Sequence, residues 1–216
     1  MTRVRVKVCG VRSLPEARAA IDAGADAIGF NFWRESPRYI EPAEAHAVIA
    51  SLPPFVSRVG VFVNEEADHI EGIATSVGLD AIQLHGDETR DFCRRLRLID
   101  KLKGVAFIKA VRVETEADVE GIWAYPVGAI LLDSKKRGAY GGTGERFDWR
   151  LAVRAAEFAP IILAGGLKVE NVREAIGSVR PFAVDVCSGV ESSPGVKDFG
   201  RMRAFIAEVE KANRDD

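Results

Sequence analysis

The sequence predicts a single-domain α/β protein, a closed (β/α)₈ barrel of the TIM-barrel type formed by residues 1–216. Short apolar runs alternate with amphipathic segments along the whole chain, and there are eight of each. Because each helix returns the chain in the same direction, such units imply a parallel sheet. Eight of them within 216 residues suit a closed barrel near the small end of its size range.

An open, doubly wound sheet is the alternative architecture. A dinucleotide-binding sheet of that kind has a GxGxxG turn after its first strand, and this sequence has none. Neither a low-complexity linker nor a shift in composition marks a second domain. The closed barrel is therefore the favoured prediction.

The individual elements follow from the hydrophobic pattern and from the residues that punctuate it. Ser13, Pro15 and Glu16 mark the start of the first helix, with proline in the first turn and glutamate at the capping-box spacing. Gly24 and Gly78 follow helices and close them. The predicted strands are residues 4–9, 27–32, 58–63, 81–85, 106–110, 127–133, 160–164 and 182–186. The predicted helices are residues 14–23, 42–51, 66–77, 88–99, 116–123, 149–158, 169–176 and 197–212.

Side chains alternate between the two faces of a strand, so polar residues can be assigned to one face. In the first strand, valine at every even position opposes Arg5, Lys7 and Cys9. Because the surrounding helices need apolar partners, the valine and isoleucine series should face outward. The side chains expected to point into the barrel near its catalytic mouth are Lys7, Cys9, Asp133 and Asp185.

Composition narrows the possible partners. The net charge is −2 and long runs of like charge are lacking, so the composition does not indicate binding to nucleic acid or to a membrane surface. No run approaches the ~20 apolar residues of a membrane span, and the charged first strand does not resemble a signal peptide. The three cysteines, Cys9, Cys93 and Cys187, have no metal-ligand spacing. We therefore expect a reduced, cytoplasmic enzyme without metal or other cofactor.

Cys9 and Asp133 are the candidate catalytic residues. They end the first and sixth strands and would face each other across the barrel, which suits a base and an acid on two sides of a small substrate. Cys9 would have to be partly thiolate, which a cation such as Lys7 favours. Three alternatives remain open: Cys9 as an inert buried thiol, Asp133 as a cap, and Lys7 as a structural ion pair with Asp185.

Two glycine-containing loops indicate a phosphate site. Gly165 and Gly166 end the seventh strand, and Ser188 and Gly189 follow the eighth. Loops at these positions in such barrels often bind phosphate through backbone N–H groups. A third loop, residues 135–144, combines basic residues with glycine, as in a segment that closes over an anionic ligand, although an ordinary loop has the same composition.

Further polar residues follow other strands. Arg38, after Ser36 and Pro37, is placed to bind a carboxylate, unless it is a solvated surface arginine. His85 belongs to a group expected to line the barrel mouth, with Asn31, Asn64 and Gln83. The candidate substrate-binding residues are thus Arg38, His85, Gly165, Gly166, Asp185, Ser188 and Gly189.

Taken together, these motifs resemble the phosphoribosylanthranilate isomerase family, the single-domain barrels of tryptophan biosynthesis. The matching segments run in order over almost the whole chain, which makes the set specific although each motif alone is weak. They are KVCG at 7–10, SPRY at 36–39, QLHG at 83–86, LLDS at 131–134, GGTG at 141–144, FDW at 147–149, LAGGL at 163–167, DVCSGVE at 185–191 and GVKD at 195–198.

The resemblance implies an Amadori rearrangement of N-(5-phosphoribosyl)anthranilate that requires no cofactor. Asp133 would match the family's general acid and Cys9 its general base. Arg38 would match the residue that holds the anthranilate carboxylate, and Gly165, Gly166, Ser188 and Gly189 the phosphate loops. The expected partner is this phosphorylated small molecule, and the expected assembly is a monomer or a homodimer.

Two positions depart from the family pattern, and other functions compete with this one. Cys187 stands where the family usually has serine, and Trp33 is less usual in the second loop. A histidine-pathway isomerase would use a pair of aspartates, against which Cys9 argues; the tryptophan synthase α subunit is a further phosphosugar barrel. A non-catalytic phosphate-binding module is a third alternative, against which the presence of both Cys9 and Asp133 argues.

Overall fold

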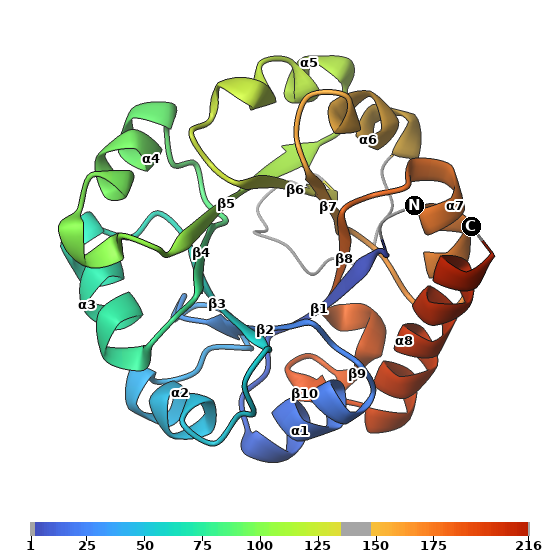
Figure 1. The fold of residues 1–216 in the computed structure, drawn as a ribbon, viewed down its shortest axis with the longest axis horizontal. Helices are drawn as coiled ribbons and strands as arrows, with labels where there is room; N and C mark the ends of the chain where they lie inside the picture. Colours follow the sequence, from blue (N-terminus) through green and yellow to red (C-terminus); the bar gives the residue numbers. More distant parts are fainter. Residues whose placement is uncertain (1–2, 135–147, 216) are drawn as a thin grey trace.

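Eight parallel strands close into a barrel in the computed structural model, which describes residues 3–134 and 148–215. The strands follow one another around the ring in chain order, and the eighth pairs with the first (Figure 1). The predicted fold class is confirmed. The strands are β1 (Arg5–Cys9), β2 (Ala27–Asn31), β3 (Ser57–Phe62), β4 (Ala81–Leu84), β5 (Ala106–Val113), β6 (Ala129–Ser134), β7 (Ile161–Leu163) and β8 (Ala183–Val186).

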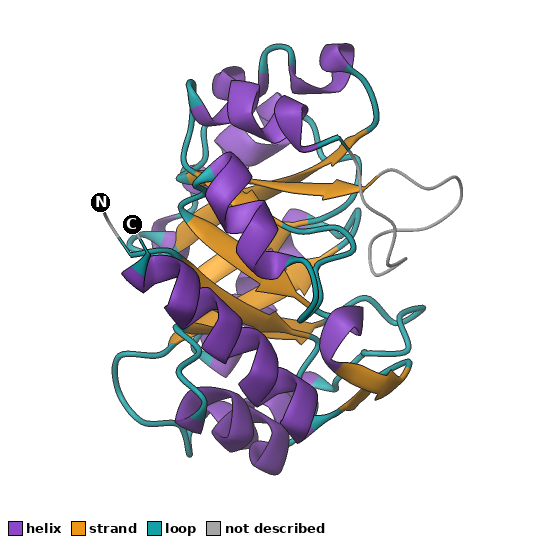
Figure 2. Cartoon of the chain, turned by 90° about the vertical axis from the view of Figure 1, so that its right-hand side faces the viewer, coloured by secondary structure: helices purple, strands orange, loops and turns teal. Residues whose placement is uncertain are grey.

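The α-helices form an outer ring around these strands (Figures 1 and 2). They are α1 (Leu14–Asp22), α2 (Pro42–Ile49), α3 (Ala67–Val77), α4 (Arg90–Arg97), α5 (Glu116–Val119), α6 (Trp149–Ala156), α7 (Val172–Val179) and α8 (Phe199–Arg214). Each lies within or close to its predicted interval. None of the helices described has the length and apolar character that crossing a membrane would need.

Short elements that the periodicity did not predict are the main difference. Three 3₁₀ turns, η1 (Asp100–Leu102), η2 (Ile122–Ala124) and η3 (Ser188–Val190), follow α4, α5 and β8. A small antiparallel pair, β9 (Glu191–Ser193) and β10 (Val196–Lys197), precedes α8. These segments contain only two or three residues each, too few for a repeating apolar pattern to appear.

Helix starts use the predicted capping chemistry. The Ser13 side chain accepts a hydrogen bond from the Glu16 N–H, with Pro15 in the first turn of α1. Asp198 caps α8 in the same way, through the Arg201 N–H at 2.9 Å. Gly78 ends α3 with φ 79°, a left-handed conformation that glycine adopts without steric cost.

Strand alternation divides the apolar residues into two separate clusters. The larger cluster lies between strands and helices and contains Val4, Val6 and Val8. The smaller one fills the barrel interior and includes Val59, Ile108, Leu131 and Ile162. This separation confirms the predicted orientation, in which the valine series faces the helices and the Cys9 series faces inward.

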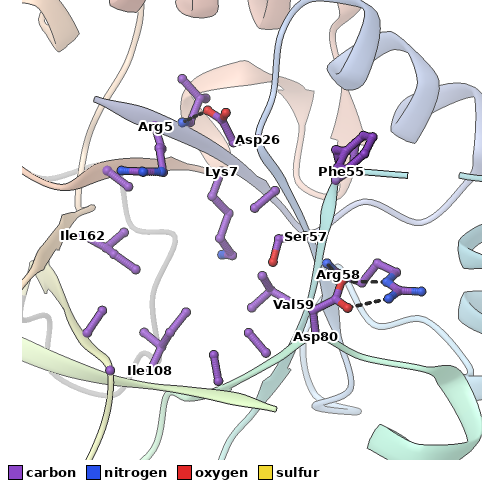
Figure 3. A pocket seen from close by; sticks show the side chains of 18 of the residues that line it. Arg5, Lys7, Asp26, Phe55, Ser57, Arg58, Val59, Asp80, Ile108 and Ile162 are labelled. Atoms are coloured by element: carbon purple, nitrogen blue, oxygen red, sulfur yellow. Dashed lines mark hydrogen bonds and ion pairs between the residues drawn. The ribbon is translucent and has the colours of Figure 1, made fainter. Parts of the chain in front are cut away.

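A cavity of about 1070 Å³ opens at the N-terminal end of the barrel (Figure 3). Small side chains explain it, because the first inward position of most strands is alanine or serine: Ala27, Ser57, Ala81, Ala106, Ala129 and Ala183. Lys7 projects into the cavity from β1, and Phe55 stands at its edge (Figure 3). The barrel interior is therefore packed in its middle but hollow at this end.

Close packing between sheet and helices predicts the effect of one added methyl group. A Cβ at Gly60, which faces outward on β3, would lie 2.3 Å from Leu79 Cδ1 and 2.9 Å from Phe62 Cε2. We expect Gly60→Ala to lower the free energy of unfolding by about 1–3 kcal/mol, measured by urea denaturation.

The matched control is Gly72→Ala on the exposed face of α3, where an added Cβ meets nothing within 4 Å. Alanine forms helix better than glycine, so this variant should be unchanged or more stable by up to about 1 kcal/mol. Equal destabilisation of the two variants would contradict the packing argument.

Candidate active site

The polar side chains gather at the C-terminal end of the barrel, opposite the large cavity. Catalytic groups of (β/α)₈ barrels lie at this end, where strands give way to loops. We call this hollow the C-terminal pocket. It is lined by Cys9, Asn31, Ser36, Arg38, Val61, Val63, Gln83, His85, Asp133, Ala164, Gly165, Gly166, Leu167, Asp185, Cys187 and Ser188. The larger cavity lacks this set of titratable groups, so the C-terminal pocket is the candidate site.

Cys9 is the last residue of β1, and its side chain is buried. The next residue, Gly10, has φ 74°, which turns the chain away from the strand. A hydrogen bond with Cys187, followed by the positive charges of Lys7 and Lys197, holds the pKa of Cys9 well below its usual range. Burial alone would raise this pKa. A lowered pKa is the direction of shift that favours the thiolate form of a cysteine.

Lys7 and Asp185 form a buried ion pair just beneath Cys9. Lys7 Nζ donates to Asp185 Oδ1 at 2.9 Å, and both side chains are almost inaccessible. Burial raises the pKa of Asp185 to about 6, against the attraction of Lys7. Burial disfavours the charged form of Lys7 too, but attraction by Asp185 and Cys9 outweighs it and raises the pKa of Lys7. Lys7 therefore combines both roles considered from the sequence, partner of Asp185 and cation beside the thiol.

Asp133 ends the inward series of β6 and shares the pocket with Cys9. Its Oδ1 accepts a hydrogen bond from the Ser134 N–H at 2.8 Å. Its Oδ2 lies 3.4 Å from His85 Nε2, and His85 Nδ1 lies 2.8 Å from Gln83 Nε2. His85 Nε2 is buried and makes no hydrogen bond with the described residues, so the imidazole lies beside the Asp133 carboxylate without bonding to it.

A second buried ion pair holds the His85 loop, and sequence reasoning missed it. Lys109 Nζ donates to Glu88 Oε2 at 2.8 Å, and also to the carbonyl oxygens of Leu84 and Gly86. Glu88 in turn accepts from the backbone N–H groups of Gly86 and Asn64. The lysine interrupting the apolar, helix-facing series of β5 was the only signal for this pair.

Arg38 lies in the pocket, but another side chain already engages it. Its Nε and Nη2 donate to the two carboxylate oxygens of Glu191, at 2.9 and 2.8 Å. Lys197 Nζ donates to Glu191 Oε1 at 2.9 Å. Burial alone would raise the pKa of Glu191, but Arg38 and Lys197 lower it. The bidentate bond leaves the remaining guanidinium N–H groups of Arg38 available to a ligand. Glu191 and Lys197 also belong to the site, although the sequence did not predict them.

The two predicted phosphate loops meet beside Asp133. Gly165 and Gly166 have φ 75° and 66°, and a Cβ at Gly165 would lie 2.6 Å from the Ser134 nitrogen. Asn171 fastens this loop through the Gly166 carbonyl and the Lys168 N–H, both at 2.9 Å. Ser188 lines the pocket, whereas Gly189 is not among the lining residues. A Cβ at Gly189 would lie 2.0 Å from the Leu167 carbonyl oxygen, so this glycine lets the two loops pack together.

The expected segment that closes over an anion falls on residues 135–144, outside the described residues, as does the motif at 141–144. Within residues 3–134 and 148–215, no group of three or more His, Cys, Asp or Glu is placed to hold a metal ion. The chemical groups available in the described pocket are therefore thiols, carboxylates, cations and the backbone of glycine loops.

A family model and a sequence relative identify the same enzyme family. A family model described as N-(5'phosphoribosyl)anthranilate (PRA) isomerase matches residues 6–208. The chain is 49% identical over 203 residues to N-(5'-phosphoribosyl)anthranilate isomerase of Geobacter sulfurreducens, covering 94% of this chain and 97% of that protein.

Solved structures agree with this result. One is a phosphoribosyl anthranilate isomerase in complex with reduced 1-(o-carboxyphenylamino)-1-deoxyribulose 5-phosphate, with TM-score 0.85 and 44% identity over 96% of this chain and 99% of that chain. Another consists of monomers generated from the dimeric isomerase of Thermotoga maritima, with TM-score 0.84 and 43% identity over the same shares, 96% and 99%.

The buried Lys109–Glu88 pair generates a stability prediction. Lys109→Met would leave Glu88 buried without its cation, so we expect the free energy of unfolding to fall by about 3–5 kcal/mol in urea denaturation. Adding Glu88→Gln should recover part of the loss, because the amide oxygen still accepts from Gly86 while no charge remains.

The control is Arg154→Met, which breaks the exposed pair between Arg154 and Glu116. Such a pair contributes about 1 kcal/mol at most. A Lys109→Met protein no less stable than this control would mean that the buried pair does not hold the His85 loop.

Proposed function

This chain belongs to the N-(5'-phosphoribosyl)anthranilate isomerase family, and from that membership we propose that Cys9 and Asp133 are the base and the acid of its reaction. The protein is an isomerase of tryptophan biosynthesis that converts N-(5'-phosphoribosyl)anthranilate into 1-(2-carboxyphenylamino)-1-deoxyribulose 5-phosphate. The observation that carries the assignment is a single pocket with a thiol of lowered pKa from β1 and a carboxylate from β6.

The acid step begins at the furanose ring. Asp133, protonated, donates its proton to the ring oxygen as the bond from C1′ to that oxygen breaks, which opens the sugar to a Schiff base. The hydrogen bond from the Ser134 N–H at 2.8 Å supports this role, because it limits the directions that the carboxyl group can face. A catalytic group held in one orientation meets the reacting atom with less loss of entropy.

The base step follows at the neighbouring carbon. The Cys9 thiolate removes the C2′ proton, and the electron pair of that C–H bond flows to the Schiff base nitrogen, which gives an enolamine. Proton transfer to C1′ and loss of the hydroxyl proton at C2′ then produce the ketone. Proton transfers alone complete the rearrangement, so neither metal nor organic cofactor is needed.

The two charged ends of the substrate have complementary groups in the pocket. The anthranilate carboxylate suits the guanidinium N–H groups of Arg38 that Glu191 does not use. The phosphate suits the backbone of Gly165, Gly166 and Ser188, with Gly189 bringing the second loop close enough. His85 and Asp185 would border the sugar between these ends.

Loss of either catalytic group should abolish most of the activity. We expect Cys9→Ser and Asp133→Asn each to lower kcat at least about a hundredfold, the usual contribution of one acid or base. The measurement is the change in anthranilate fluorescence with freshly made phosphoribosylanthranilate. Cys93→Ala, which removes a buried thiol from α4 outside the pocket, is the control and should keep near-normal activity. Near-full activity in both pocket variants would overturn the assignment.

We also propose that the protein forms a homodimer through the N-terminal end of its barrel. Phe55 is fully exposed with φ 70°, an unfavourable conformation for a phenylalanine, at the rim of the 1070 Å³ cavity (Figure 3). In a two-fold dimer each Phe55 loop would enter the partner's cavity, which is a self-complementary contact. The relative from Thermotoga maritima is dimeric, which supports the oligomeric state proposed for this chain. The three free cysteines suit a reducing compartment, which supports a cytoplasmic location.

Removing the aromatic ring should weaken this dimer. We expect Phe55→Ser to sediment as a monomer at micromolar concentration and the wild type as a dimer, because a buried phenylalanine contributes about 150–250 Å² of contact. Leu98→Ser, which changes an exposed apolar side chain at the end of α4, should leave the dimer intact. A monomeric wild type, or an unchanged Phe55→Ser dimer, would contradict the proposal.

A further inference from the structure

The small antiparallel pair of β9 and β10 places a buried carboxylate and a buried ammonium group beside the C-terminal pocket. Lys197 stands opposite Glu191 in the register of this pair. Lys197 Nζ donates to Glu191 Oε1 at 2.9 Å, and the side chains of the two residues are 0% and 3% exposed. Neither residue is among those that line the C-terminal pocket. A ligand in the pocket is therefore reached by their charges and not by direct contact.

Arg38 is the side chain that connects this pair with the pocket. Its Nε and Nη2 donate to the two oxygens of Glu191, at 2.9 and 2.8 Å. Its stem packs against Gly10, where an added Cβ would lie 2.9 Å from Arg38 Cδ. The turn between β9 and β10 also approaches the preceding residue, since a Cβ at Gly195 would lie 2.5 Å from the Pro37 carbonyl oxygen. Arg38 is thus held on its stem and on one edge of its guanidinium group.

The three charged side chains do not balance one another. Arg38 and Lys197 each carry one positive charge, and the Glu191 carboxylate between them carries one negative charge. This Arg38–Glu191–Lys197 cluster therefore has a net charge of +1. Lys7 and Asp185, the other buried ion pair at the pocket, are one cation and one anion. Buried charge is costly without a partner, so one more anion would complete the cluster.

The part of Arg38 that remains has the shape to bind a carboxylate. Among the described residues, none hydrogen-bonds Arg38 Nη1. The guanidinium edge from Nη1 to the second N–H of Nη2 carries two parallel N–H groups, which match the two oxygens of a carboxylate. The phosphate of the substrate suits another part of the pocket, the backbone of Gly165 and Gly166.

We propose that Lys197 is a specificity-determining residue, whose buried charge gives the Arg38–Glu191–Lys197 cluster its preference for a substrate with a carboxylate on the aromatic ring. The proposal rests on the proposed function, in which Arg38 binds that carboxylate. Glu191 holds Arg38 in place but cancels one positive charge, and Lys197 restores the charge that Glu191 cancels. An aromatic amine without a carboxylate would leave the excess charge buried and unpaired, so the cluster selects against it.

The test has to separate this effect from a second influence of Lys197. The positive charge of Lys197 also lowers the pKa of Cys9, so a change in activity alone would not isolate the carboxylate. Binding of two unreactive ligands that differ only in the carboxylate avoids this difficulty. The charge on Cys9 acts on both ligands, whereas the proposed effect acts on one.

The experiment measures dissociation constants by isothermal titration calorimetry. One ligand is reduced 1-(o-carboxyphenylamino)-1-deoxyribulose 5-phosphate, and the other is the same molecule without its carboxylate. Lys197→Gln keeps an N–H donor for Glu191 but no charge, and Lys197→Met keeps neither. For both variants we expect the carboxylated ligand to bind about tenfold more weakly than to the wild type, the effect of losing one nearby charge. The ligand without a carboxylate should bind within about twofold of the wild type.

Two further variants provide a rescue and a control. Adding Glu191→Gln to Lys197→Met returns the net charge of the cluster to +1, while the glutamine oxygen can still accept from Arg38. Binding of the carboxylated ligand should therefore recover several-fold relative to Lys197→Met alone. Lys211→Met removes a positive charge from an exposed pair with Glu208 on α8, and it should bind both ligands as the wild type does.

The single variants should fold, because Arg38 and Glu191 remain as a balanced pair, and either variant is sufficient for the comparison. An equal loss of affinity for the two ligands would overturn the proposal, and it is also the result expected if the cluster held the phosphate. An unchanged affinity for the carboxylated ligand would overturn it as well. So would a loss in Lys197→Met without a loss in Lys197→Gln, because the lysine would then act through its hydrogen bond alone.

Failure of the proposed function gives different results. If Arg38 does not bind the carboxylate, the wild type itself will bind the two ligands with equal affinity. If Cys9 and Asp133 are not the base and the acid, their variants will remain active while the binding results stay as expected. The binding measurements require no turnover, so the two proposals can fail independently.

Discussion

The pairing of β1 with β8 is the constraint on which the site depends. It joins the two ends of the sheet and brings together Lys7 and Asp185, which are 178 residues apart in the chain. The same register then places Cys9 beside Cys187 one step nearer the mouth. A shift by one residue would turn each of these side chains toward the helices, because strand side chains alternate between the faces.

Two groups of buried, oppositely charged side chains lie close to Cys9 and Cys187. Lys7 is paired with Asp185, and Glu191 is paired with both Arg38 and Lys197. Buried pairs of this kind contribute little net stability because desolvating the ions offsets their attraction. Their effect here is electrostatic, because the positive charges of Lys7 and Lys197 lower the pKa of the buried Cys9 thiol.

The barrel uses its two ends differently, and side-chain size explains the division. Alanines at the N-terminal end leave a large apolar cavity beside the exposed Phe55 loop. Larger side chains such as Ile108, Leu131 and Ile162 pack the interior between that cavity and the C-terminal pocket. A surface suited to a second copy and a site suited to a small substrate thus lie at opposite ends of the barrel, and Lys7 reaches from the first cavity to Asp185 in the second pocket.

Local sequence was sufficient for the barrel, the eight strands and the inward direction of Cys9, Asp133 and Asp185, because hydrophobic periodicity and helix caps act over a few residues. The ordered motifs also indicated the family. Local patterns did not reveal the Arg38–Glu191 pair, whose members are 153 residues apart. Nor did they reveal the Lys109–Glu88 pair, which joins β5 to the loop after β4. Such contacts depend on the register between strands distant in the chain, which only closure of the barrel sets.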